Sequence, residues 1–231
     1  YEEGDKTGNP VFTIADTIVW LAQAADNNSI VRKLQVVKIR RQAPMPGLHT
    51  YRITEGGLQV FPRLPLAVDE HERETPTGRA STGVPGLDEM MGGGIPIGDS
   101  VLVAGPSGSG KSVLATQFIA EGGKHGEAGV LVVFEEHPKE YLYRADALGF
   151  KLQDMIDAGT LEAMYLRPLD LSPDETLFEI REAVKRVGAK RVVIDSMSGF
   201  ELALAPTFRA DFRESLYRLV GALTGVGITV L

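Results

Sequence analysis

The stretch GPSGSGKS at residues 105–112 is the part of the chain whose residue types and spacing best fit a chemical role. It fits the pattern G-x-x-x-x-G-K-[ST], with Lys111 and Ser112 as its last two residues. Glycines let the backbone turn so that several N–H groups point into one concavity, and a helix beginning at Lys111 adds its positive N-terminal end. We expect this concavity to bind phosphate groups. The expected phosphate-binding residues are Gly105, Pro106, Ser107, Gly108, Ser109, Gly110, Lys111, Ser112 and Val113.

A carboxylate at the end of a second strand would complete a site for a phosphate-bound metal ion. In this pattern the lysine amine reaches the β- and γ-phosphates, while the Ser112 hydroxyl can ligate Mg²⁺. The stretch RVVIDS at residues 191–196 has Asp195 after a run of apolar β-branched residues. An aspartate can also end a strand simply as a cap, but near a phosphate loop it supplies the hard oxygen that Mg²⁺ prefers. We therefore expect Ser112 and Asp195 to hold Mg²⁺.

Two adjacent glutamates have the chemistry of a catalytic base. Glu135 and Glu136 stand at the carboxyl end of the apolar stretch VLVVF, residues 130–134. Hydrolysis of a phosphate bond needs a group that orients or deprotonates the attacking water. Neighbouring strand residues point to opposite faces, but at the end of a strand the chain turns and both carboxylates can reach one site. We expect at least one to be catalytic; the alternative is a pair of solvated acids that cap the helix after His137 and Pro138. For His137 itself we expect a structural role.

Strands and helices alternate along residues 99–231. The expected strands cover residues 99–105, 129–136, 161–166, 191–196 and 227–231, and the expected helices cover 111–126, 137–150, 172–189 and 208–225. The helix at 172–189 has the clearest signals, because Ser172 can cap its start and Gly188 its end. Continuously apolar strands separated by helices indicate a mostly parallel sheet covered by helices on both faces, which is an α/β fold.

The first part of the chain has a different pattern. Strands are expected at residues 11–23, 29–42, 49–55 and 58–62, with the sequence EGG before the last strand marking a hairpin. These extra strands are antiparallel and have no helix of their own to cover them. Charged residues and a proline at positions 69–82 lack apolar periodicity and indicate a linker. The expected organisation is a β-rich region at residues 1–68, a linker at 69–82 and a phosphate-binding core at 83–231.

Composition restricts the classes of protein that remain. The chain has 231 residues, a formal net charge of −7 and no cysteine, which excludes disulfides and thiolate metal sites. The acidic balance argues against nucleic acid binding, apart from a local basic stretch at residues 31–42. No apolar run reaches the ~20 residues of a membrane helix, and the opening YEEGDKTGNP does not fit a signal peptide. We therefore expect a cytoplasmic protein with no membrane and no nucleic acid partner.

The long run STGVPGLDEMMGGGIPIGDSVLVAGPSGSGKSVLATQFI, together with VVFEEHP and RVVIDS, resembles the KaiC branch of the RecA-like ATPases. The lead-in TGVPGLDEMMGGGIP and the doubled glutamate are typical of that branch. The resemblance covers residues 77–231 and implies a RecA-like P-loop fold with ATP and Mg²⁺ as ligands and ADP as product. It also implies a homo-oligomer, which is a hexameric ring in the intact protein.

Residues 1–68 resemble the carboxyl-terminal strands of a KaiC-type domain, which normally follow the segment that ends here at GITVL. KaiC itself carries two such domains in tandem. The chain is therefore expected to contain the end of one domain and most of the next, so that the second domain lacks its own closing strands. A circular permutation is the alternative that gives the same order.

A K-x-R pair on one of these strands reaches into the nucleotide site of the next subunit in the family. Lys38 and Arg40 match that pair in this sequence. Cations at a phosphate between subunits stabilise charge in the transition state, as an arginine finger does. The alternative is that both side chains belong to a solvated strand face.

Four functions fit these residues and the resemblance. The first is an ATPase module of a ring assembly. The second is a KaiC-like serine/threonine autokinase, for which Thr13 stands at the family's acceptor position beside Phe12, where the family has serine. The third is a DNA-dependent recombinase or helicase relative, which the acidic balance and the doubled glutamate disfavour. The fourth is a scaffold that binds ATP without turnover.

Overall fold

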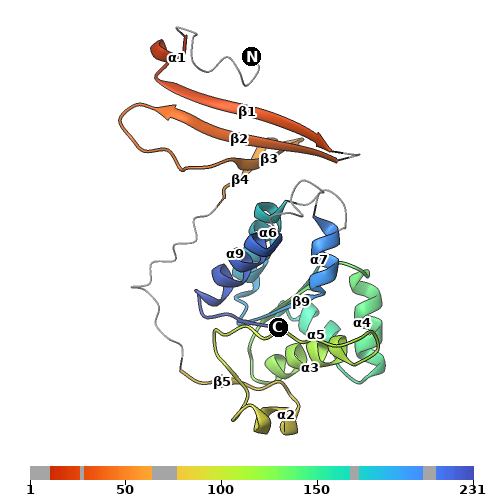
Figure 1. Cartoon of the computed structure of the whole chain (residues 1–231). Helices are drawn as coiled ribbons and strands as arrows, with labels where there is room; N and C mark the ends of the chain where they lie inside the picture. The colour runs from red at the N-terminus through yellow and green to blue at the C-terminus, as the bar shows by residue number, and fades with distance from the viewer. Residues whose placement is uncertain (1–10, 27–28, 64–76, 167–171, 205–211) are drawn as a thin grey trace. The chain divides into compact units, whose positions relative to one another are not determined.

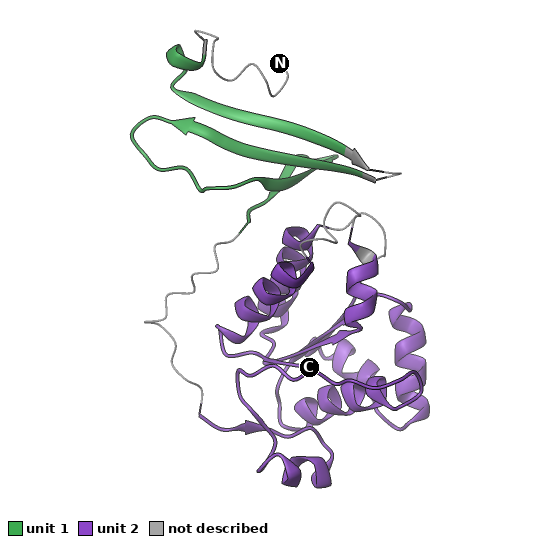
Figure 2. Ribbon diagram, viewed as in Figure 1, with its two compact units in different colours: residues 1–64 green, residues 65–231 purple. Residues whose placement is uncertain are grey.

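The computed structural model describes residues 11–26, 29–63, 77–166, 172–204 and 212–231. The chain divides into two compact units, Tyr1–Leu64 and Pro65–Leu231, which we call unit 1 and unit 2 (Figure 2). Each unit has a four-stranded sheet of its own, and unit 2 also has a two-stranded ribbon. The two units are described separately below.

Unit 1 is an antiparallel sheet preceded by a short helix (Figure 1). Its elements are α1 (Val11–Ile14), β1 (Thr17–Asp26), β2 (Ser29–Ile39), β3 (His49–Thr54) and β4 (Gly57–Phe61), in the sheet order β1-β2-β3-β4. The predicted hairpin is confirmed, because Thr54 pairs with Gly57, whose φ of 103° is a left-handed conformation that favours glycine. The antiparallel strands predicted for this region are also confirmed.

The strand prediction is wrong at residues 11–14, which form α1 instead. The amine of Lys38, on β2, donates hydrogen bonds to the Phe12 carbonyl at 3.0 Å and to the Thr13 carbonyl at 3.3 Å. Carbonyl groups at the end of a helical turn have no partner within the helix, and a cation there is favourable. The carbonyl groups of this turn thus gain hydrogen bonds from the Lys38 side chain. The apolar pattern of residues 11–14 alone does not reveal this contact.

The main sheet of unit 2 is parallel and lies between two layers of helices (Figure 1). Its strands are β7 (Gly129–Val133), β8 (Leu161–Tyr165), β9 (Arg191–Asp195) and β10 (Thr229–Val230), in the order β10-β9-β7-β8. In the ladder between β7 and β9, Val133 is the partner of Asp195. The predicted α/β architecture with a parallel sheet is therefore confirmed.

Helices cover both faces of this sheet, as predicted. One layer contains α3 (Lys111–Lys124), α4 (Pro138–Ala147) and α5 (Leu152–Asp157), and the other contains α6 (Pro173–Val187) and α9 (Phe212–Thr224). The caps predicted for α6 are confirmed: Ser172 accepts a hydrogen bond from the Glu175 amide at 3.1 Å, and Gly188 ends the helix with a φ of 65°. The short helices α2 (Pro85–Met90), α5 and α7 (Met197–Ala203) were not predicted.

The expected strand at residues 99–105 is reduced to a single bridge, in which Ser100 pairs in parallel with Val230 of β10. The Val101 amide donates to the Val230 carbonyl at 2.8 Å, and beyond this point the segment has no regular ladder. Leu102 is 79% exposed. The strand prediction is wrong here because β10 has only two residues, too few to extend a ladder along the whole segment.

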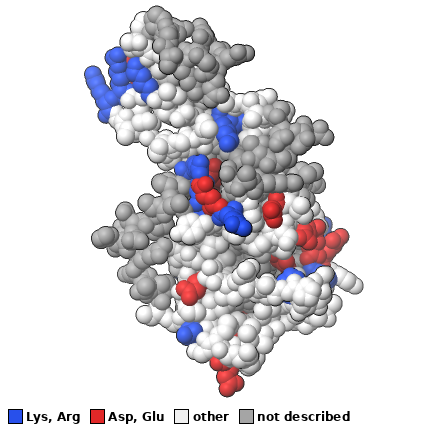
Figure 3. Space-filling model, viewed as in Figure 1, with Lys and Arg blue, Asp and Glu red and all other residues white. Residues whose placement is uncertain are grey.

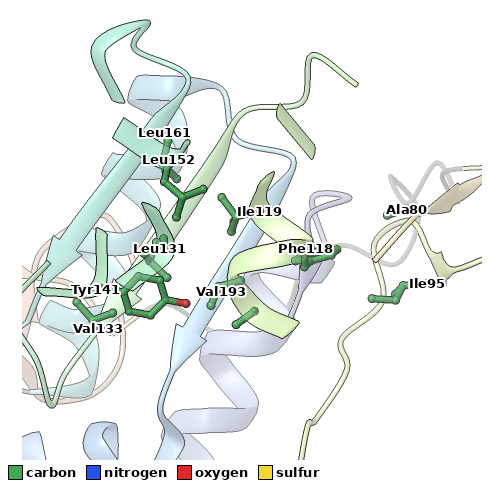
Figure 4. Close-up of a cluster of buried hydrophobic side chains, with 12 residues drawn as sticks. Ala80, Ile95, Phe118, Ile119, Leu131, Val133, Tyr141, Leu152, Leu161 and Val193 are labelled. Carbon is green, nitrogen blue, oxygen red and sulfur yellow. The ribbon is translucent and has the colours of Figure 1, made fainter. Parts of the chain in front are cut away.

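The core on the α3 side of the sheet consists of side chains from β7, β8, β9, the two-stranded ribbon and three helices (Figure 4). Leu131 and Val133 alternate along β7 and face this core, where they meet residues of α3 such as Phe118 and Ile119. Alternate residues of a strand point to the same face, so β7 can bury both of its faces only if every residue is apolar. This packing fixes α3, which carries the glycine-rich loop at its start, against β7, which Glu135 follows, and β9, which ends in Asp195.

A buried arginine connects the start of unit 2 to this core. Arg191 is 2% exposed; it forms an ion pair with Glu127 at 2.6 Å and donates to the carbonyls of Ser81 and Phe118 at 2.6 and 2.8 Å. Ser81 follows β5 (Arg79–Ala80), which pairs with β6 (Ile95–Pro96) and falls within the residues for which we predicted a linker. The guanidinium group therefore holds the segment before α2 against α3.

Candidate phosphate site

The glycine-rich loop leads directly into α3. Gly108 and Gly110 have φ values of 79° and 94°, a left-handed conformation that side chains with a Cβ rarely adopt. Residues 105–110 are exposed, and the Lys111 amine donates to the carbonyls of Gly105 and Pro106 at 2.8 and 2.9 Å. The amine therefore lies over the loop, next to the N-terminus of a fourteen-residue helix. An anion here would meet a cation, the free N–H groups of the helix and its positive dipole end.

Asp195, at the end of β9, has a buried carboxylate oxygen, Oδ2, that makes no hydrogen bond within the described parts of the chain. A buried carboxylate oxygen without a partner is unfavourable, and a cation or a hydrogen-bond donor would compensate for it. In the same described residues no group of three or more His, Cys, Asp or Glu could hold a metal ion by itself. The donor set fits Mg²⁺, which commonly takes one or two protein oxygens and completes its shell with phosphate and water.

Glu135 is held at the end of β9 by a side-chain hydrogen bond. The Ser196 hydroxyl donates to Glu135 Oε1 at 2.7 Å, and the same hydroxyl oxygen accepts from the Gly199 amide as the N-cap of α7. A Cβ atom on Gly199 would come within 2.8 Å of Phe134 Cβ and 3.0 Å of Glu135 Cγ. Close approach of α7 thus fixes the position of Glu135. We did not predict these roles of Ser196 and Gly199 from the sequence, although Ser196 directly follows Asp195.

Glu136 has a different environment. It forms an ion pair with Arg144, which lies one turn from the end of α4. Burial raises the pKa of Glu136; Arg144 lowers it, while Asp195, Glu140 and Glu135 add to the increase, and the net direction is upward. Glu136 therefore lies close enough to Asp195 for electrostatic interaction, whereas Glu135 is hydrogen-bonded to Ser196, the residue after β9.

A family model described as the KaiC ATPase matches residues 80–231, which is more than half of the chain. The chain belongs to the KaiC ATPase family. Similar proteins include the circadian clock oscillator protein KaiC of Acaryochloris marina, which is 28% identical over 80% of this chain and 35% of its own length. The corresponding protein of Parasynechococcus marenigrum is 35% identical over 65% of this chain and 31% of its own length. A UPF0273 protein of Methanopyrus kandleri is 33% identical over 65% of this chain and 64% of its own length.

Membership of the KaiC family confirms the predicted RecA-like P-loop fold and the resemblance on which it was based. The chain spans about a third of the length of the KaiC proteins that it matches. The KaiC of Picosynechococcus aligns with 90% of this chain, over 208 residues, which is more than the length of unit 2. That alignment therefore includes part of unit 1, in the same order as here.

Two further sequence predictions for this KaiC-family chain concern unit 1. Lys38 bonds the carbonyls at α1, as described above, and Arg40 forms an ion pair with Asp16 at 2.8 Å. Basic side chains gather at one edge of unit 1, whereas both signs of charge are interspersed on the visible face of unit 2 (Figure 3). The contact of Lys38 and Arg40 with a nucleotide of a neighbouring subunit stays a prediction.

His137 has the structural role that was expected for it. Its Nδ1 accepts a hydrogen bond from the Lys139 amide at 3.2 Å, which makes His137 the N-cap of α4. This cap fixes the start of α4 immediately after the two glutamates. No helix within the described ranges combines the length and apolar character needed to cross a membrane.

Proposed function

We propose that this chain binds ATP together with Mg²⁺ and hydrolyses the bond between the β- and γ-phosphates. The observation that carries the proposal is the unpartnered, buried carboxylate oxygen of Asp195, at the end of the strand next to β7, which Glu135 and Glu136 follow. An exposed glycine-rich loop at the start of a long helix supplies an end that favours phosphate, and a Mg²⁺ ion on that phosphate would compensate the Asp195 carboxylate. Membership of an ATPase family supports ATP as the substrate.

The phosphate groups would lie against the loop at residues 105–110. Backbone N–H groups of the loop and of the first turn of α3 bind the phosphate oxygens, and the Lys111 amine moves from the loop carbonyls to the β- and γ-phosphates. The Ser112 hydroxyl and the Asp195 carboxylate would hold Mg²⁺, which would neutralise negative charge on the phosphates. This arrangement uses the unpartnered oxygen of Asp195.

Glu135 is the proposed base for the attacking water. Its carboxylate is exposed and is fixed at the edge of the sheet by the Ser196 hydroxyl. Water attacks the γ-phosphorus, the bond to the β-phosphate oxygen breaks, and the water proton passes to Glu135, giving ADP and phosphate. Glu136, which is paired with Arg144, contributes charge to the same edge.

The proposal extends to the assembly and to the order of the two units. The alignment of one KaiC over 90% of this chain supports residues 1–68 as the closing part of one KaiC domain, followed by a linker at 69–82. Residues 83–231 are then most of the next domain. In a hexameric ring, Lys38 and Arg40 would reach the nucleotide of a neighbouring subunit.

The test follows the fate of ATP labelled on the γ-phosphate, in the presence of Mg²⁺. The variant Lys111→Ala removes the cation at the loop, and Lys124→Ala at the exposed other end of α3 is the matched control. We expect the wild type and Lys124→Ala to release labelled phosphate, and Lys111→Ala to lose at least about 10²-fold in rate. If Lys111→Ala releases phosphate as fast as the control, the loop is not the hydrolytic site.

Label that stays attached to the protein would instead support the autokinase, with Thr13 as the first residue to map. Label that stays on ATP in every sample would contradict hydrolysis by this chain. Equilibrium binding of ATP to the wild type and to Lys111→Ala then separates a nucleotide-binding scaffold from a chain that does not bind ATP. These outcomes distinguish the three functions that use the same loop.

A further inference from the structure

A buried tyrosine hydroxyl contacts the backbone of the helix that carries the proposed phosphate site. Tyr141, on α4, is 1% exposed, and its ring belongs to the apolar core of unit 2. Figure 4 shows the ring next to Val133 with its hydroxyl group directed toward α3. A polar group in such a core is costly unless it finds hydrogen-bond partners, so the partners define where the ring can sit.

Both partners of the hydroxyl lie in the first turns of α3. The Tyr141 hydroxyl donates to the Ser112 carbonyl at 3.2 Å and accepts from the Thr116 hydroxyl at 3.0 Å. The Thr116 hydroxyl also lies 2.7 Å from the Ser112 carbonyl, and Thr116 is 4% exposed. The single proton of Thr116 can serve only one of these acceptors at a time, whereas the proton of Tyr141 can go to the Ser112 carbonyl. The three residues therefore form a closed, buried polar triangle.

The triangle connects the two sides of the proposed site. Ser112 is the residue whose hydroxyl is the proposed Mg²⁺ ligand, and it follows Lys111. Tyr141 lies in the helix that starts three residues before it, immediately after Glu135, Glu136 and the capping His137. The distance from the phosphate-binding turn to the glutamate edge thus depends on a contact between α3 and α4 that lies under the site.

The surroundings of Tyr141 act on its phenol. Burial raises the pKa of Tyr141 far above its ordinary value; the hydrogen bond from Thr116 lowers it, and the charge of Asp195 raises it further. The influence of Asp195 on Tyr141 also means that the triangle and the proposed metal ligand are within electrostatic reach of each other.

We infer that the Tyr141 hydroxyl is a positioning group for the nucleotide site: it fixes Ser112 and the first turn of α3 relative to the carboxylates that follow β7 and β9. This inference rests on the proposed ATPase function. Tyr141 touches neither phosphate nor water in this role, and it acts only through Ser112. A group of this kind affects how well Mg²⁺ and the phosphates are aligned for reaction, rather than how well the base and sugar bind.

The test removes hydroxyl groups without removing the packing around them. Tyr141→Phe deletes one oxygen atom, and Thr116→Val deletes the other while Thr116→Ser retains it. Tyr143→Phe is the matched control, because it makes the same chemical change in the same helix at a side chain that is 78% exposed. For each full-length variant we would measure kcat, KM for ATP, the Mg²⁺ concentration for half-maximal rate, and thermal stability.

We expect Tyr141→Phe and Thr116→Val each to lower kcat about three- to tenfold and to raise the required Mg²⁺ concentration, because each loses one buried hydrogen bond. KM for ATP should change less than about twofold, since the contacts with the rest of the nucleotide remain. Thr116→Ser and Tyr143→Phe should match the wild type. A purely structural role predicts lower thermal stability with unchanged kcat and Mg²⁺ dependence in the folded variants, and that result would overturn the inference.

A second readout separates this inference from the ATPase proposal itself. If the wild type binds ATP without hydrolysing it, we would measure the affinity for a fluorescent ATP analogue with and without Mg²⁺. Tyr141→Phe should then reduce the gain in affinity that Mg²⁺ brings, and an unchanged gain overturns the inference. If the wild type hydrolyses ATP and Tyr141→Phe behaves like Tyr143→Phe, the inference fails while the ATPase proposal stands. If the wild type binds no ATP at all, both fail together.

Discussion

Glu135 accepts a hydrogen bond of 2.7 Å from the hydroxyl group of Ser196, so the side chain that follows β7 is joined directly to the residue that follows Asp195. Two carboxylates that are separated by sixty residues in the sequence are thereby held at one edge of the sheet. Glu136, the next residue, instead pairs with Arg144 in α4. The two adjacent glutamates thus have different partners, and this difference can be tested.

The first prediction concerns the catalytic base. Glu135→Gln retains the shape and the hydrogen bond with Ser196 but removes the negative charge that accepts a proton. We expect kcat for ATP hydrolysis to fall by about 10²–10⁴-fold, with ATP affinity nearly unchanged. Glu201→Gln, at an exposed position in α7, is the control and should retain full activity. Equal rates for Glu135→Gln and the control would rule out Glu135 as the base.

The second prediction concerns the close approach of α7 to Glu135. A methyl group at Gly199 would overlap Phe134 Cβ and Glu135 Cγ, at 2.8 and 3.0 Å. We expect Gly199→Ala to lower the free energy of unfolding by about 1–3 kcal/mol and to lower kcat, because Glu135 must shift. Chemical denaturation and steady-state kinetics measure the two effects.

The control for this variant is Gly221→Ala. Gly221 lies within α9, and a Cβ atom there would meet nothing within 4 Å. Because alanine favours a helix over glycine, this change should stabilise the protein by up to about 1 kcal/mol without affecting kcat. Equal stability of the two variants would mean that α7 can move away from the strand at little cost.

The third prediction concerns pH. Burial is the main reason that the pKa of Glu136 lies above its ordinary value of 4.5, so the folded protein binds this proton more tightly than the unfolded chain does. The stability gained from the proton is present at low pH and is lost as the pH rises through 4.5 and on through the raised folded-state pKa. Relative to Glu136→Gln, the wild type should therefore lose stability as the pH rises above about 4.5.

Urea unfolding of the wild type and Glu136→Gln across this pH range measures the effect. The loss of the ion pair with Arg144 changes the free energy of unfolding of the variant at every pH. The informative quantity is therefore how the difference in free energy of unfolding between the wild type and the variant changes with pH. A flat difference for Glu136→Gln would show that the carboxyl group titrates alike in the folded and unfolded chains, and would contradict the prediction.

The fourth prediction concerns the buried Arg191. Arg191→Met keeps much of the apolar volume but leaves the carbonyls of Ser81 and Phe118 without this donor. We expect the free energy of unfolding to fall by about 2–4 kcal/mol, since buried acceptors lose their partner while Glu127 is partly exposed and can be hydrated. Lys190→Met, at the exposed neighbouring position, should change stability by less than about 0.5 kcal/mol. A similar effect of both variants would contradict the structural role of Arg191.

The sequence predicted those features that depend on local patterns. Apolar β7 and β9, the capped helix α6 and the glycine-rich loop all follow from residue type and spacing, and the structure has each of them. Asp195 and the glutamates were found because parallel strands end at one edge of a sheet. The expectation that the nucleotide is ATP came from the family resemblance, because no local pattern specifies the base.

Features that depend on contacts between distant segments were missed or misread. The apolar residues at 11–14 form a helical turn because Lys38, on another element, satisfies its carbonyls. The strand expected at 99–105 depends on a neighbour, β10, that is only two residues long. Three of the missed residues act through hydrogen-bond partners that are 25 or more residues away: Ser196, Tyr141 and Thr116. A fourth, Gly199, acts because α7 closely approaches the residues after β7. The sequence around each of these positions therefore gives no signal of its role.

The pairing of Val133 with Asp195 in the β7–β9 ladder has a consequence for how this site can change. Parallel strands can shift relative to each other only by whole residues, and each shift moves a strand end by about 3.3 Å and turns its side chains to the opposite face. The spacing between the acids at the edge is therefore quantised rather than continuously adjustable. Insertions or deletions within either strand should abolish the site in a single step, whereas the loops at the same edge can vary in length and leave the spacing intact.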